Sequence, residues 1–334
     1  MDMSYLYLVD CSTKLGISEN YLVVKKGQEI CERIPIETLE EVSVYGGCQV
    51  TTQCIHECLK RSIPIIYYSA GGKYLGRLQP EGSIGVKRQR KQAVFNENEA
   101  SFELAKKIVE AKIHNQTVVL RRYASSKGED LSDVYKHMKI LKNKISASES
   151  IEEIMGYEGN AARSYFGGLS RLVEVEFKFD GRNRRPPKDP FNAMLSFGYS
   201  ILLSEIYGKI IAKGLNPYFG FIHQDREYYP TLASDLMEEW RPVIVDSVVM
   251  SMINGHEIFM NQFETGEDQG IYMSYEARKA FVRKMEVKFN QQIKYLKYVD
   301  YPVSFRRALE LQVNCLVHVL EEEKTEAYEP ILIR

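Results

Sequence analysis

The stretch YEGNAARSYF, from Tyr157 to Phe166, belongs to a longer segment in which apolar residues recur every three or four positions. That spacing predicts an amphipathic helix. The apolar stripe consists of Ile151, Ile154, Met155, Ala162, Tyr165 and Leu169. Glu158 falls on the same stripe, although carboxylates are seldom buried without a cation or another partner. The sequence therefore predicts that a cation meets Glu158 inside the fold.

The size and composition of the chain are those of an ordinary globular protein. Its 334 residues suggest about two domains, at roughly 150 residues each. Hydrophobic residues make up 44% and charged residues 27%. The formal net charge of -1 gives no indication of a nucleic-acid partner. No apolar run reaches the roughly 18 residues of a membrane span, so we expect a soluble, cytoplasmic protein without a membrane partner.

The six cysteines are spread along the chain without a dense framework, which indicates reduced thiols of a cytoplasmic protein. Cys54, His56 and Cys58 lie close enough together to suggest a zinc site. A structural zinc site needs four ligands, however, and no second pair follows in the sequence. We therefore interpret these positions as small buried residues on a helix.

The first eighty residues predict a small β domain. Runs rich in Val, Ile and Tyr alternate with turn residues: SYLYLVD, NYLVVKK, EEVSVYG and IPIIYYS. The segment SAGGKYLGRL has the Gly-Gly of a tight turn between two extended runs, and one short helix is expected from about Thr51 to Arg61. We predict that residues 1–82 form a β-sandwich-like domain with a role in dimerisation and assembly, since it offers few catalytic groups.

The pattern changes after Pro80. PEGSIG is turn-forming, and KRQRK is a basic run that we interpret as a solvated linker within residues 83–97. Helical periodicity begins after Asn98, so we predict an all-α catalytic domain over 98–334 and an α+β fold class. Its centre is the apolar helix FNAMLSFGYSILLSEIYGKII, which follows the breaker PPKDP. Further helices are expected from near Thr231, over about 276–298 and over 302–323.

Two segments offer partners for Glu158. NPYFGFIHQDREYYP places His223 on a loop, where a lone histidine is more often structural than a ligand. TLASDLMEEWRPVIVD predicts a helix on which Asp235 shares a face with Glu238 and Glu239. Solvated surface acids are the ordinary explanation of such a face. This helix is apolar enough to be packed, however, and like charges on a packed face repel unless they are neutralised.

A divalent metal would neutralise these acids together with Glu158. Carboxylate oxygens and one imidazole suit Mg²⁺ or Mn²⁺, and Mg²⁺ typically works on phosphates. The sequence has no HExxH motif, no GxxxxGK[ST] loop and no convincing serine nucleophile elbow. The residues alone therefore predict a metal-dependent reaction, most simply on phosphodiesters, and they leave open the choice between Glu238 and Glu239.

Three segments resemble, in order and spacing, the CRISPR-associated endonuclease and integrase that acquires new spacers. They are YEGNAARSYF, RRPPKDPFNAMLSFGYSILLSEI and GLNPYFGFIHQDREYYPTLASDLMEEWRPVIVD, and the N-terminal strands ending in IPIIYYSAGGKYLGRL are similar to the β domain of that family. The resemblance implies that Glu158, His223 and Glu238 are catalytic and hold Mg²⁺ or Mn²⁺. It also implies that Asp235 is a further catalytic acid at this site, and it favours Glu238 over Glu239 as the ligand.

The resemblance further implies a function in antiviral defence. The metal site would insert short foreign DNA duplexes into a CRISPR array by attack of a DNA 3′-hydroxyl, and would cleave DNA when water attacks. Implied partners are double-stranded DNA, a second copy of the chain in a homodimer, and a small ferredoxin-like protein that completes a heterohexamer. Two alternatives remain open: a nonspecific or branched-DNA nuclease in repair, and a non-catalytic DNA-binding scaffold.

Local clusters of basic residues predict where DNA binds. Arg182, Arg184 and Arg185 lie in a Pro-rich loop about two dozen residues after Glu158 and are candidates for holding phosphate. Arg163 is either another phosphate contact or the partner of a site carboxylate. Nine basic residues against two acidic ones between positions 278 and 307 indicate a second cluster, from which we select Arg283, Lys284 and Lys288.

Overall fold

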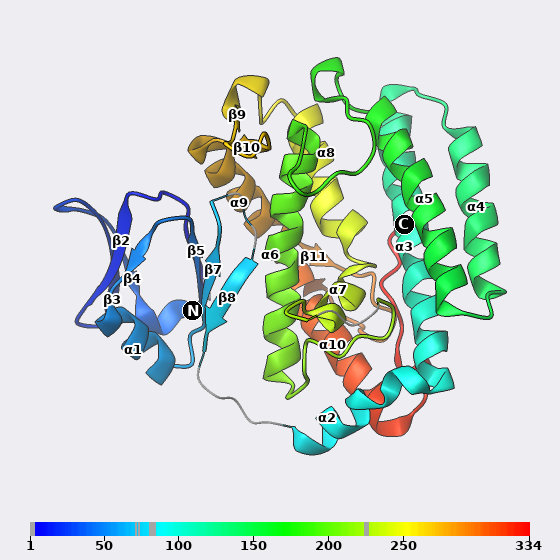
Figure 1. The fold of residues 1–334 in the computed structure, drawn as a ribbon, viewed down its shortest axis with the longest axis horizontal. Coiled ribbons are helices and arrows are strands. Elements are labelled where there is room, and N and C mark those ends of the chain that lie inside the picture. The colour runs from blue at the N-terminus through cyan, green and yellow to red at the C-terminus, as the bar shows by residue number, and fades with distance from the viewer. Residues whose placement is uncertain (1–3, 71, 73, 80–84, 224–226) are drawn as a thin grey trace.

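The computed structural model describes residues 4–70, 72, 74–79, 85–223 and 227–334. A small β-rich domain lies beside a larger helical domain (Figure 1), which confirms the predicted α+β class and the order of the two parts. Within the described residues, no helix has the length and apolar character that crossing a membrane requires.

The described part of the β domain contains two four-stranded sheets. Their strand orders are β1-β5-β7-β8 and β4-β3-β2-β6. The strands are β1 (Ser4–Leu8), β2 (Thr13–Ser18), β3 (Tyr21–Lys26), β4 (Glu29–Pro35), β5 (Leu39–Tyr45), β6 (Gln49–Val50), β7 (Ile65–Tyr68) and β8 (Tyr74–Leu78). The predicted short helix is α1 (Thr52–Lys60), and the thiols of Cys54 and Cys58 are buried on it as expected, whereas His56 is exposed.

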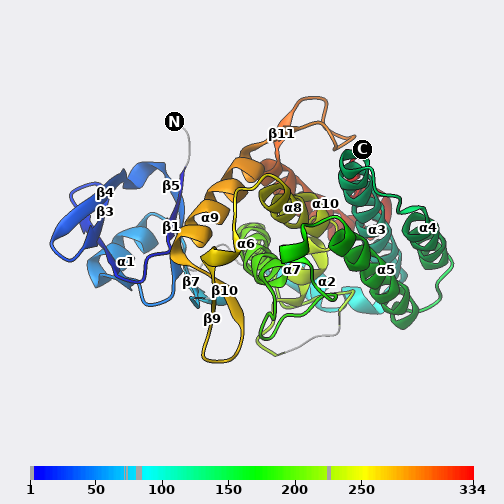
Figure 2. The same cartoon turned by 90° about the horizontal axis from the view of Figure 1, so that it is seen from above.

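The sheet that contains β5 and β7 is buried on both faces, as is usual for parallel strands. One face shares a core with the second sheet and α1. The other face presents Tyr45 and Tyr68, which stack with ring centroids 4.6 Å apart. Tyr45 also contacts Phe197 of the helical domain at 5.2 Å. Aromatic packing therefore joins the two domains into one continuous core. Figure 2 shows the sheet that contains β1, β5 and β7 beside the helical domain.

The larger domain is helical apart from short hairpins. Its helices are α2 (Val86–Ala93), α3 (Glu99–Lys127), α4 (Ser132–Ser146), α5 (Ile151–Arg171), α6 (Pro190–Ala212), α7 (Thr231–Met237), α8 (Ser247–Asn254), α9 (Tyr275–Asn290) and α10 (Phe305–Glu322). The hairpins pair β9 (Phe263–Thr265) with β10 (Ile271–Met273), and β11 (Gln292–Ile293) with β12 (Val303–Ser304).

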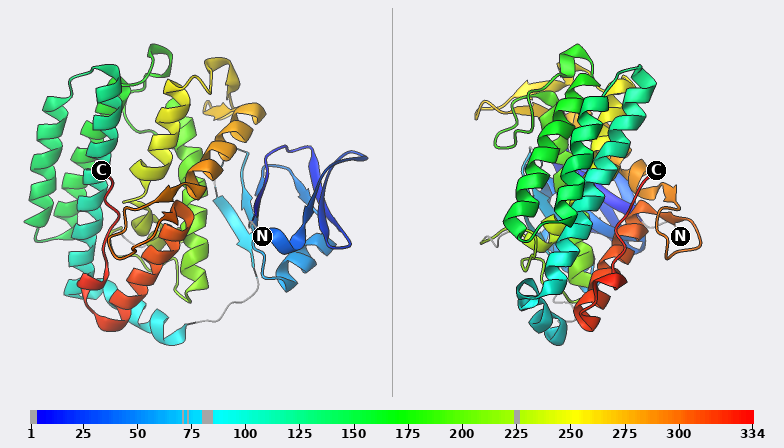
Figure 3. Two further views of the ribbon diagram at one scale, coloured as in Figure 1. Left: turned by 180° about the vertical axis from the view of Figure 1, so that it is seen from behind. Right: turned by 90° about the vertical axis from the view of Figure 1, so that its right-hand side faces the viewer.

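Helices α3, α4 and α5 pack side by side at the end of the molecule far from the β domain, and α6 lies at its centre (Figure 3). Helix α6 begins as its sequence predicts, because the side chain of Asp189 accepts the N–H of Asn192 at 2.7 Å and Pro190 occupies the first turn. Buried residues lie on all of its sides, which confirms its predicted place in the core.

The helix predicted over 276–298 is too long. Helix α9 ends at Asn290, and the chain then becomes extended at Gln291 to form β11. The buried residues Phe289, Ile293 and Leu296 are spaced four and three apart, as in a helix. The apolar pattern therefore could not distinguish a continuing helix from a hairpin that buries the same side chains.

The basic run KRQRK is exposed at Lys87, Arg90 and Lys91, as predicted for a solvated segment, but it is not an irregular linker. It forms most of helix α2, whose side chains bind the end of α10. Arg88 donates to the Glu321 carboxylate at 2.8 Å, and Lys91 donates to the Glu321 carbonyl oxygen at 2.8 Å. Unpaired carbonyl groups at a helix C-terminus attract cations, which accounts for the position of this segment.

The segment after α10 returns along α3 as an extended strap (Figure 3). Tyr328, Ile331 and Ile333 of this strap are buried. The amide of Asn115 on α3 donates to the Ile331 carbonyl oxygen at 2.9 Å and accepts the Ile333 N–H at 3.0 Å. The strap is therefore part of the core beside α3.

Candidate metal and DNA site

Helix α5 carries Glu158 as its sequence predicts. The Ser150 side chain accepts the N–H of Glu153 and starts the helix, while Ile154, Tyr165 and Leu169 are fully buried on one face. The Glu158 side chain shares that face and is 16% exposed. Helix α5 therefore directs a carboxylate toward α3 rather than into solvent.

The cation that meets Glu158 in this structure is the ammonium of Lys112. Lys112 lies on α3 and is 7% exposed. Its Nζ donates to Oε1 of Glu158 and, at 2.5 Å, to Oε2 of Glu238. The sequence interpretation missed Lys112, although it falls on the buried stripe of α3 with Leu104 and Ile108. Lys112 is thus a charged residue on an apolar stripe, and the same pattern identified Glu158.

Glu238 lies where the helix that starts at Thr231 changes its geometry. The N–H of Glu238 donates to the Asp235 carbonyl oxygen at 3.2 Å, a three-residue step tighter than an α-helix. Pro242 has no N–H for the Glu238 carbonyl group, and a π-helical turn, Pro242–Asp246, follows. Such turns are frequent at functional sites.

The predicted shared face of three acids is wrong for Glu239. The Glu239 carboxylate points away from Lys112 and accepts hydrogen bonds from the Tyr328 hydroxyl at 2.6 Å and the Ile331 N–H at 2.8 Å. Gln312 donates a further bond at 3.0 Å. Glu239 therefore anchors the C-terminal strap, while Glu238 faces Glu158 across Lys112.

Glu238 is ionised at neutral pH despite its burial. Burial raises the pKa of Glu238, but the nearby Arg241, Lys112 and His223 lower it to about 2. Arg241 Nε donates to Glu238 Oε1 at 3.1 Å. Burial lowers the pKa of Lys112, but Glu158 and Glu238 outweigh burial and raise it. The site therefore contains two carboxylates matched by an ammonium and a guanidinium.

Asp235 positions His223. Asp235 is completely buried, and its Oδ2 accepts the N–H groups of Phe221 at 2.7 Å and Ile222 at 3.0 Å. Its Oδ1 bonds Nδ1 of His223 at 2.6 Å. The loop can press this closely on Asp235 because Gly220 has no Cβ, which would lie 2.8 Å from Asp235 Oδ2. The imidazole is thereby held with Nε2 directed toward Glu238.

The imidazole Nε2 of His223 lies 3.9 Å from Oε1 of Glu238. Burial lowers the pKa of His223, but the hydrogen bond to Asp235 and the Glu238 carboxylate outweigh burial and raise it. The structure thus brings four side chains to one place: Glu158 from α5, Asp235 from α7, Glu238 from the residue after α7, and His223 from the loop before α7.

Two carboxylates and an imidazole have the donor chemistry that suits Mg²⁺ or Mn²⁺. Lys112 stands at the place between Glu158 and Glu238 where positive charge is required. With Lys112 there, no group of three or more His, Cys, Asp or Glu side chains among the described residues is arranged to hold a metal ion. The residue types therefore fit a divalent cation, which would have to share these carboxylates with Lys112 or replace it.

A cleft of about 1220 Å³ opens beside this cluster. Its lining includes Arg182, Arg184, Arg185, Tyr199 and Arg241. Two guanidinium groups contact the Tyr199 ring, with Arg241 at 4.6 Å and Arg182 at 5.4 Å from its centroid. Because Arg241 also donates to Glu238, its guanidinium connects the cleft to the carboxylate cluster.

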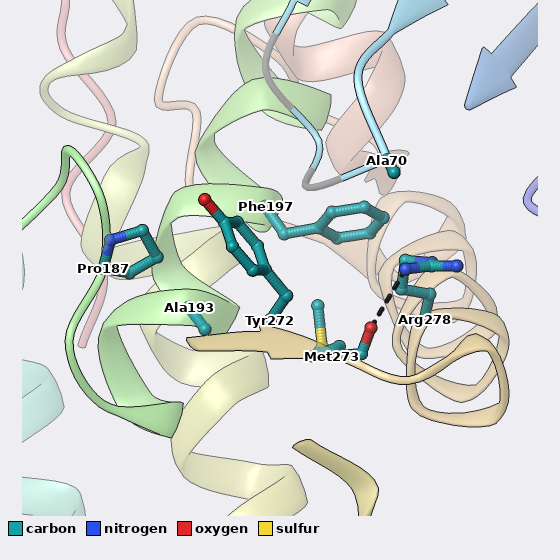
Figure 4. Close-up of a pocket in the computed structure, with 7 residues that line it drawn as sticks. All are labelled: Ala70, Pro187, Ala193, Phe197, Tyr272, Met273 and Arg278. Atoms are coloured by element: carbon teal, nitrogen blue, oxygen red, sulfur yellow. Dashed lines mark hydrogen bonds between the residues drawn. The ribbon is translucent and has the colours of Figure 1, made fainter. Parts of the chain in front are cut away.

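A small pocket where the β domain meets α6 and β10 shares Ala70 and Tyr272 with the lining of the cleft (Figure 4). There Phe197 lies near Ala70, and Arg278 donates to the Met273 carbonyl oxygen at 3.0 Å. Gly72 allows this close approach, since a Cβ at that position would lie 2.3 Å from the Phe197 ring. The β domain therefore forms part of the wall of the cleft, through Ser69, Ala70 and Tyr74.

The remaining candidates for DNA contacts lie elsewhere. Arg163 is exposed and donates to the Asn160 side chain at 3.2 Å rather than to a site carboxylate. On α9, Arg283 is exposed, Lys284 pairs with Glu257 at 2.5 Å, and Lys288 lies 4.7 Å from the centre of the Phe305 ring.

Burial lowers the pKa of Lys288 to about 8. The described lining of the cleft includes Arg182, Arg184 and Arg185 but not the three α9 residues Arg283, Lys284 and Lys288. Residues 224–226 of the loop after His223 lie outside the described residues. Of these predicted basic groups, the Pro-rich loop is therefore the one that lines the cleft.

The fold is similar to that of several solved structures. A structure described as a Cas6-RT-Cas1–Cas2 complex matches 98% of this chain with a TM-score of 0.85 at 28% identity, and this chain spans 36% of that longer protein. A casposase bound to integration product matches with a TM-score of 0.84 at 24% identity, covering 98% of this chain and 95% of that one. At this identity the casposase shows similarity of fold alone.

Sequence comparison identifies the family. The CRISPR-associated endonuclease Cas1 of Mycobacterium tuberculosis is 36% identical over 321 residues, covering 96% of this chain and 94% of that protein. A CRISPR-associated endonuclease Cas1 of Thermus thermophilus is 32% identical, covering 93% of this chain and 91% of that protein. The model of the family described as CRISPR associated protein Cas1 matches residues 6–287. The resemblance seen in the sequence is thus confirmed, and the chain belongs to the CRISPR-associated Cas1 family.

Proposed function

We propose that this chain is a metal-dependent DNA endonuclease and integrase, which inserts short foreign DNA duplexes as new spacers into a CRISPR array. The observation that carries the proposal is the buried cluster of Glu158, Glu238 and His223 beside a cleft whose lining includes five arginines and four carboxylates. Membership of the Cas1 family and the named activity of its relatives as endonucleases support it.

Glu158, Glu238 and His223 would hold Mg²⁺ or Mn²⁺. When bound, the ion would act as a Lewis acid toward a DNA phosphate and toward the oxygen of the attacking nucleophile. Asp235 holds the imidazole of His223 by Nδ1, so that Nε2 stays available. Arg241 lies between Glu238 and the cleft, where its guanidinium can neutralise a phosphate next to the cluster.

The cleft supports DNA as the substrate. Arg184 and Arg185 are exposed on its wall and can contact phosphates. Arg182 instead donates to Asn192 at 2.7 Å and Ser196 at 3.1 Å, so it orders the wall on which its neighbours stand. Both reactions attack a DNA phosphate at this site. Water as the nucleophile gives cleavage, and a DNA 3′-hydroxyl as the nucleophile gives strand transfer.

The partners follow from the family. The fold similarity to a complex described as containing Cas1 and Cas2 supports a small CRISPR adaptation partner for this chain. We propose that two homodimers, formed through the β domain, join a ferredoxin-like partner in a heterohexamer. A cytoplasmic location agrees with that assembly and with reduced cysteines.

A strand-transfer assay tests the proposal. Short duplexes with 3′-hydroxyl ends are incubated with a supercoiled plasmid that carries a repeat, in Mn²⁺ or Mg²⁺, with and without the small partner. Wild type should join the duplexes and nick the plasmid, and Glu158→Ala should do neither. Glu152→Ala is the matched control, because Glu152 lies exposed on the same helix and should leave both activities unchanged.

The outcomes separate the alternatives. Degradation without joining, even with the partner, would leave a nuclease and exclude the integrase. Activity of Glu158→Ala equal to that of wild type would exclude the proposed metal site. DNA binding by wild type with neither cleavage nor joining would leave a non-catalytic scaffold.

A further inference from the structure

The ammonium of Lys112 lies where the two carboxylates of the proposed metal site meet. It donates to Glu158 and Glu238 together, and the side chains of all three residues are at most 16% exposed. Two buried carboxylates facing each other repel, and a buried ammonium without a partner is costly. The ammonium therefore makes burial of the two carboxylates possible, and the carboxylates make burial of the ammonium possible.

The charges of the cluster already balance. Glu158 and Glu238 contribute two negative charges, while Lys112 and Arg241 contribute two positive ones. A divalent cation added to this neutral set would bring two uncompensated charges into a place shielded from water, which is unfavourable. That cost falls when the ammonium leaves the carboxylates or when DNA phosphates add negative charge.

Other charged groups near Lys112 do not change this balance. Arg241 opposes Lys112 electrostatically but has its own bond to Glu238 and its own contact with the Tyr199 ring. His223 and Asp235 form a pair with each other. Lys112 is therefore the cation held between the two carboxylates that a metal would need.

We propose that Lys112 is a positioning residue that holds Glu158 and Glu238 together when no metal is bound, and that a divalent cation competes with its ammonium for these carboxylates. This inference rests on the proposed function, because it takes the two glutamates as metal ligands. It follows that the protein without DNA binds metal weakly and that removal of the ammonium strengthens binding.

The test is the affinity for Mn²⁺ alone, measured without DNA by the EPR signal of free Mn²⁺ and by calorimetry. Lys112→Met keeps a long unbranched side chain and removes the charge. We expect it to bind Mn²⁺ about tenfold or more tightly than wild type, because a competing positive charge is gone. Lys106→Met is the matched control on the same helix, since Lys106 pairs with Glu103 at 3.0 Å and should bind as wild type does.

Thermal unfolding gives a second readout. Without metal, Lys112→Met should unfold about 5 to 10 °C below wild type, because the carboxylates lose their partner. Saturating Mn²⁺ should restore most of that loss through mass action. Combining Lys112→Met with Glu158→Gln removes the repulsion, so the double variant should be more stable than Lys112→Met without metal and should not be stabilised by Mn²⁺.

Each result decides between the two proposals. If wild type binds Mn²⁺ and Lys112→Met binds it no more tightly, this inference fails while the metal site stands. If neither protein binds Mn²⁺, the inference and the proposed function fail together. Tighter binding by Lys112→Met supports both. If Lys112→Met does not fold, a folded double variant supports the inference and an unfolded one overturns it.

Discussion

Glu238 and Glu239 are neighbours in the chain and are both buried, yet their surroundings differ in kind. Glu238 faces cations and the imidazole of His223, and its pKa falls to about 2. Glu239 faces uncharged donors from Tyr328, Gln312 and the Ile331 backbone, and burial raises its pKa to about 8. One carboxylate is kept charged, and the next is not.

The difference shows how a structure separates a chemical role from an architectural one. Uncharged donors satisfy the oxygens of Glu239 and tie the C-terminal strap to the core, with no need for a charge. Glu238 is surrounded by groups that keep it ionised. Burying a charged carboxylate has a desolvation cost, and the stability of a packed core does not require it. A carboxylate kept charged beside a cleft is a candidate for metal or phosphate chemistry.

The largest effect that should separate the two residues is on catalysis. Glu238→Gln should lower DNA cleavage and strand transfer by about a thousandfold, because it removes a charged group from the reacting centre. Glu239→Gln, assayed where it is fully folded, should stay within about a factor of ten of wild type. Rates are measured under single-turnover conditions with Mn²⁺. Equal losses in the two variants would mean that Glu239 also serves the chemistry.

The next effect is on stability, where we expect Glu239 to be the important residue. Glu239→Ala should lower the free energy of unfolding by about 2 to 4 kcal/mol, because buried donors of Tyr328, Gln312 and Ile331 lose their acceptor. The measurement is urea denaturation at neutral pH. Glu322→Ala, at an exposed position on α10, is the control and should change stability by less than about 0.5 kcal/mol. A loss below about 1 kcal/mol for Glu239→Ala would show that the strap is held by its apolar residues instead.

The sequence predicts a residue of this site only where that residue leaves a recognisable pattern in the sequence. The inward position of Glu158 followed from its place on an apolar stripe, and that helix is confirmed. Helical spacing left Glu238 and Glu239 as equal candidates, because they lie three and four residues after Asp235. Their different surroundings are tertiary contacts with Lys112 on one side and the C-terminal strap on the other. Periodicity indicates which side of a helix is buried, but not which segments of the chain meet that side.

Lys112 is the clearest omission, because its signal was present. It lies on the buried stripe of α3 as Glu158 does on α5, and pairing the two charged exceptions would have placed both helices side by side. The buried anchoring of the C-terminal strap had no such signal, since contacts between Asn115 and residues more than 200 positions later leave no periodic pattern.

A smaller effect concerns the imidazole that faces Glu238. In Asp235→Asn one carboxylate oxygen becomes an NH₂ group, which is a donor. In one orientation of the amide this NH₂ faces the N–H groups of Phe221 and Ile222, and in the other it faces His223, so one set of donors loses its acceptor. The orientation of His223 is then lost, and affinity for Mn²⁺ should fall by about 10- to 100-fold. Calorimetry with Mn²⁺ measures it. Glu227→Ser, at an exposed position on the same loop, is the control and should not alter binding. Unchanged affinity in Asp235→Asn would remove Asp235 from the site.

The smallest effect is on the pH dependence of stability, and it should have opposite sign for the two neighbours. Glu238 has a folded pKa of about 2, below its ordinary 4.5, so its contribution is full above pH 4.5 and is lost as the pH falls toward 2. Glu239 has a folded pKa of about 8, above 4.5, so the folded state retains a proton and its contribution is lost as the pH rises from 4.5 to 8.

Comparison with the matching glutamine variants isolates each slope. Between pH 5 and 6.5 the stability of wild type relative to Glu239→Gln should fall by about 2 kcal/mol, whereas relative to Glu238→Gln it should stay nearly constant. Between pH 4.5 and 3 the stability relative to Glu238→Gln should fall, and that relative to Glu239→Gln should not. Urea denaturation at closely spaced pH values measures both. Slopes of the same sign would mean that the two carboxylates share one electrostatic environment, contrary to the hydrogen bonds that separate them.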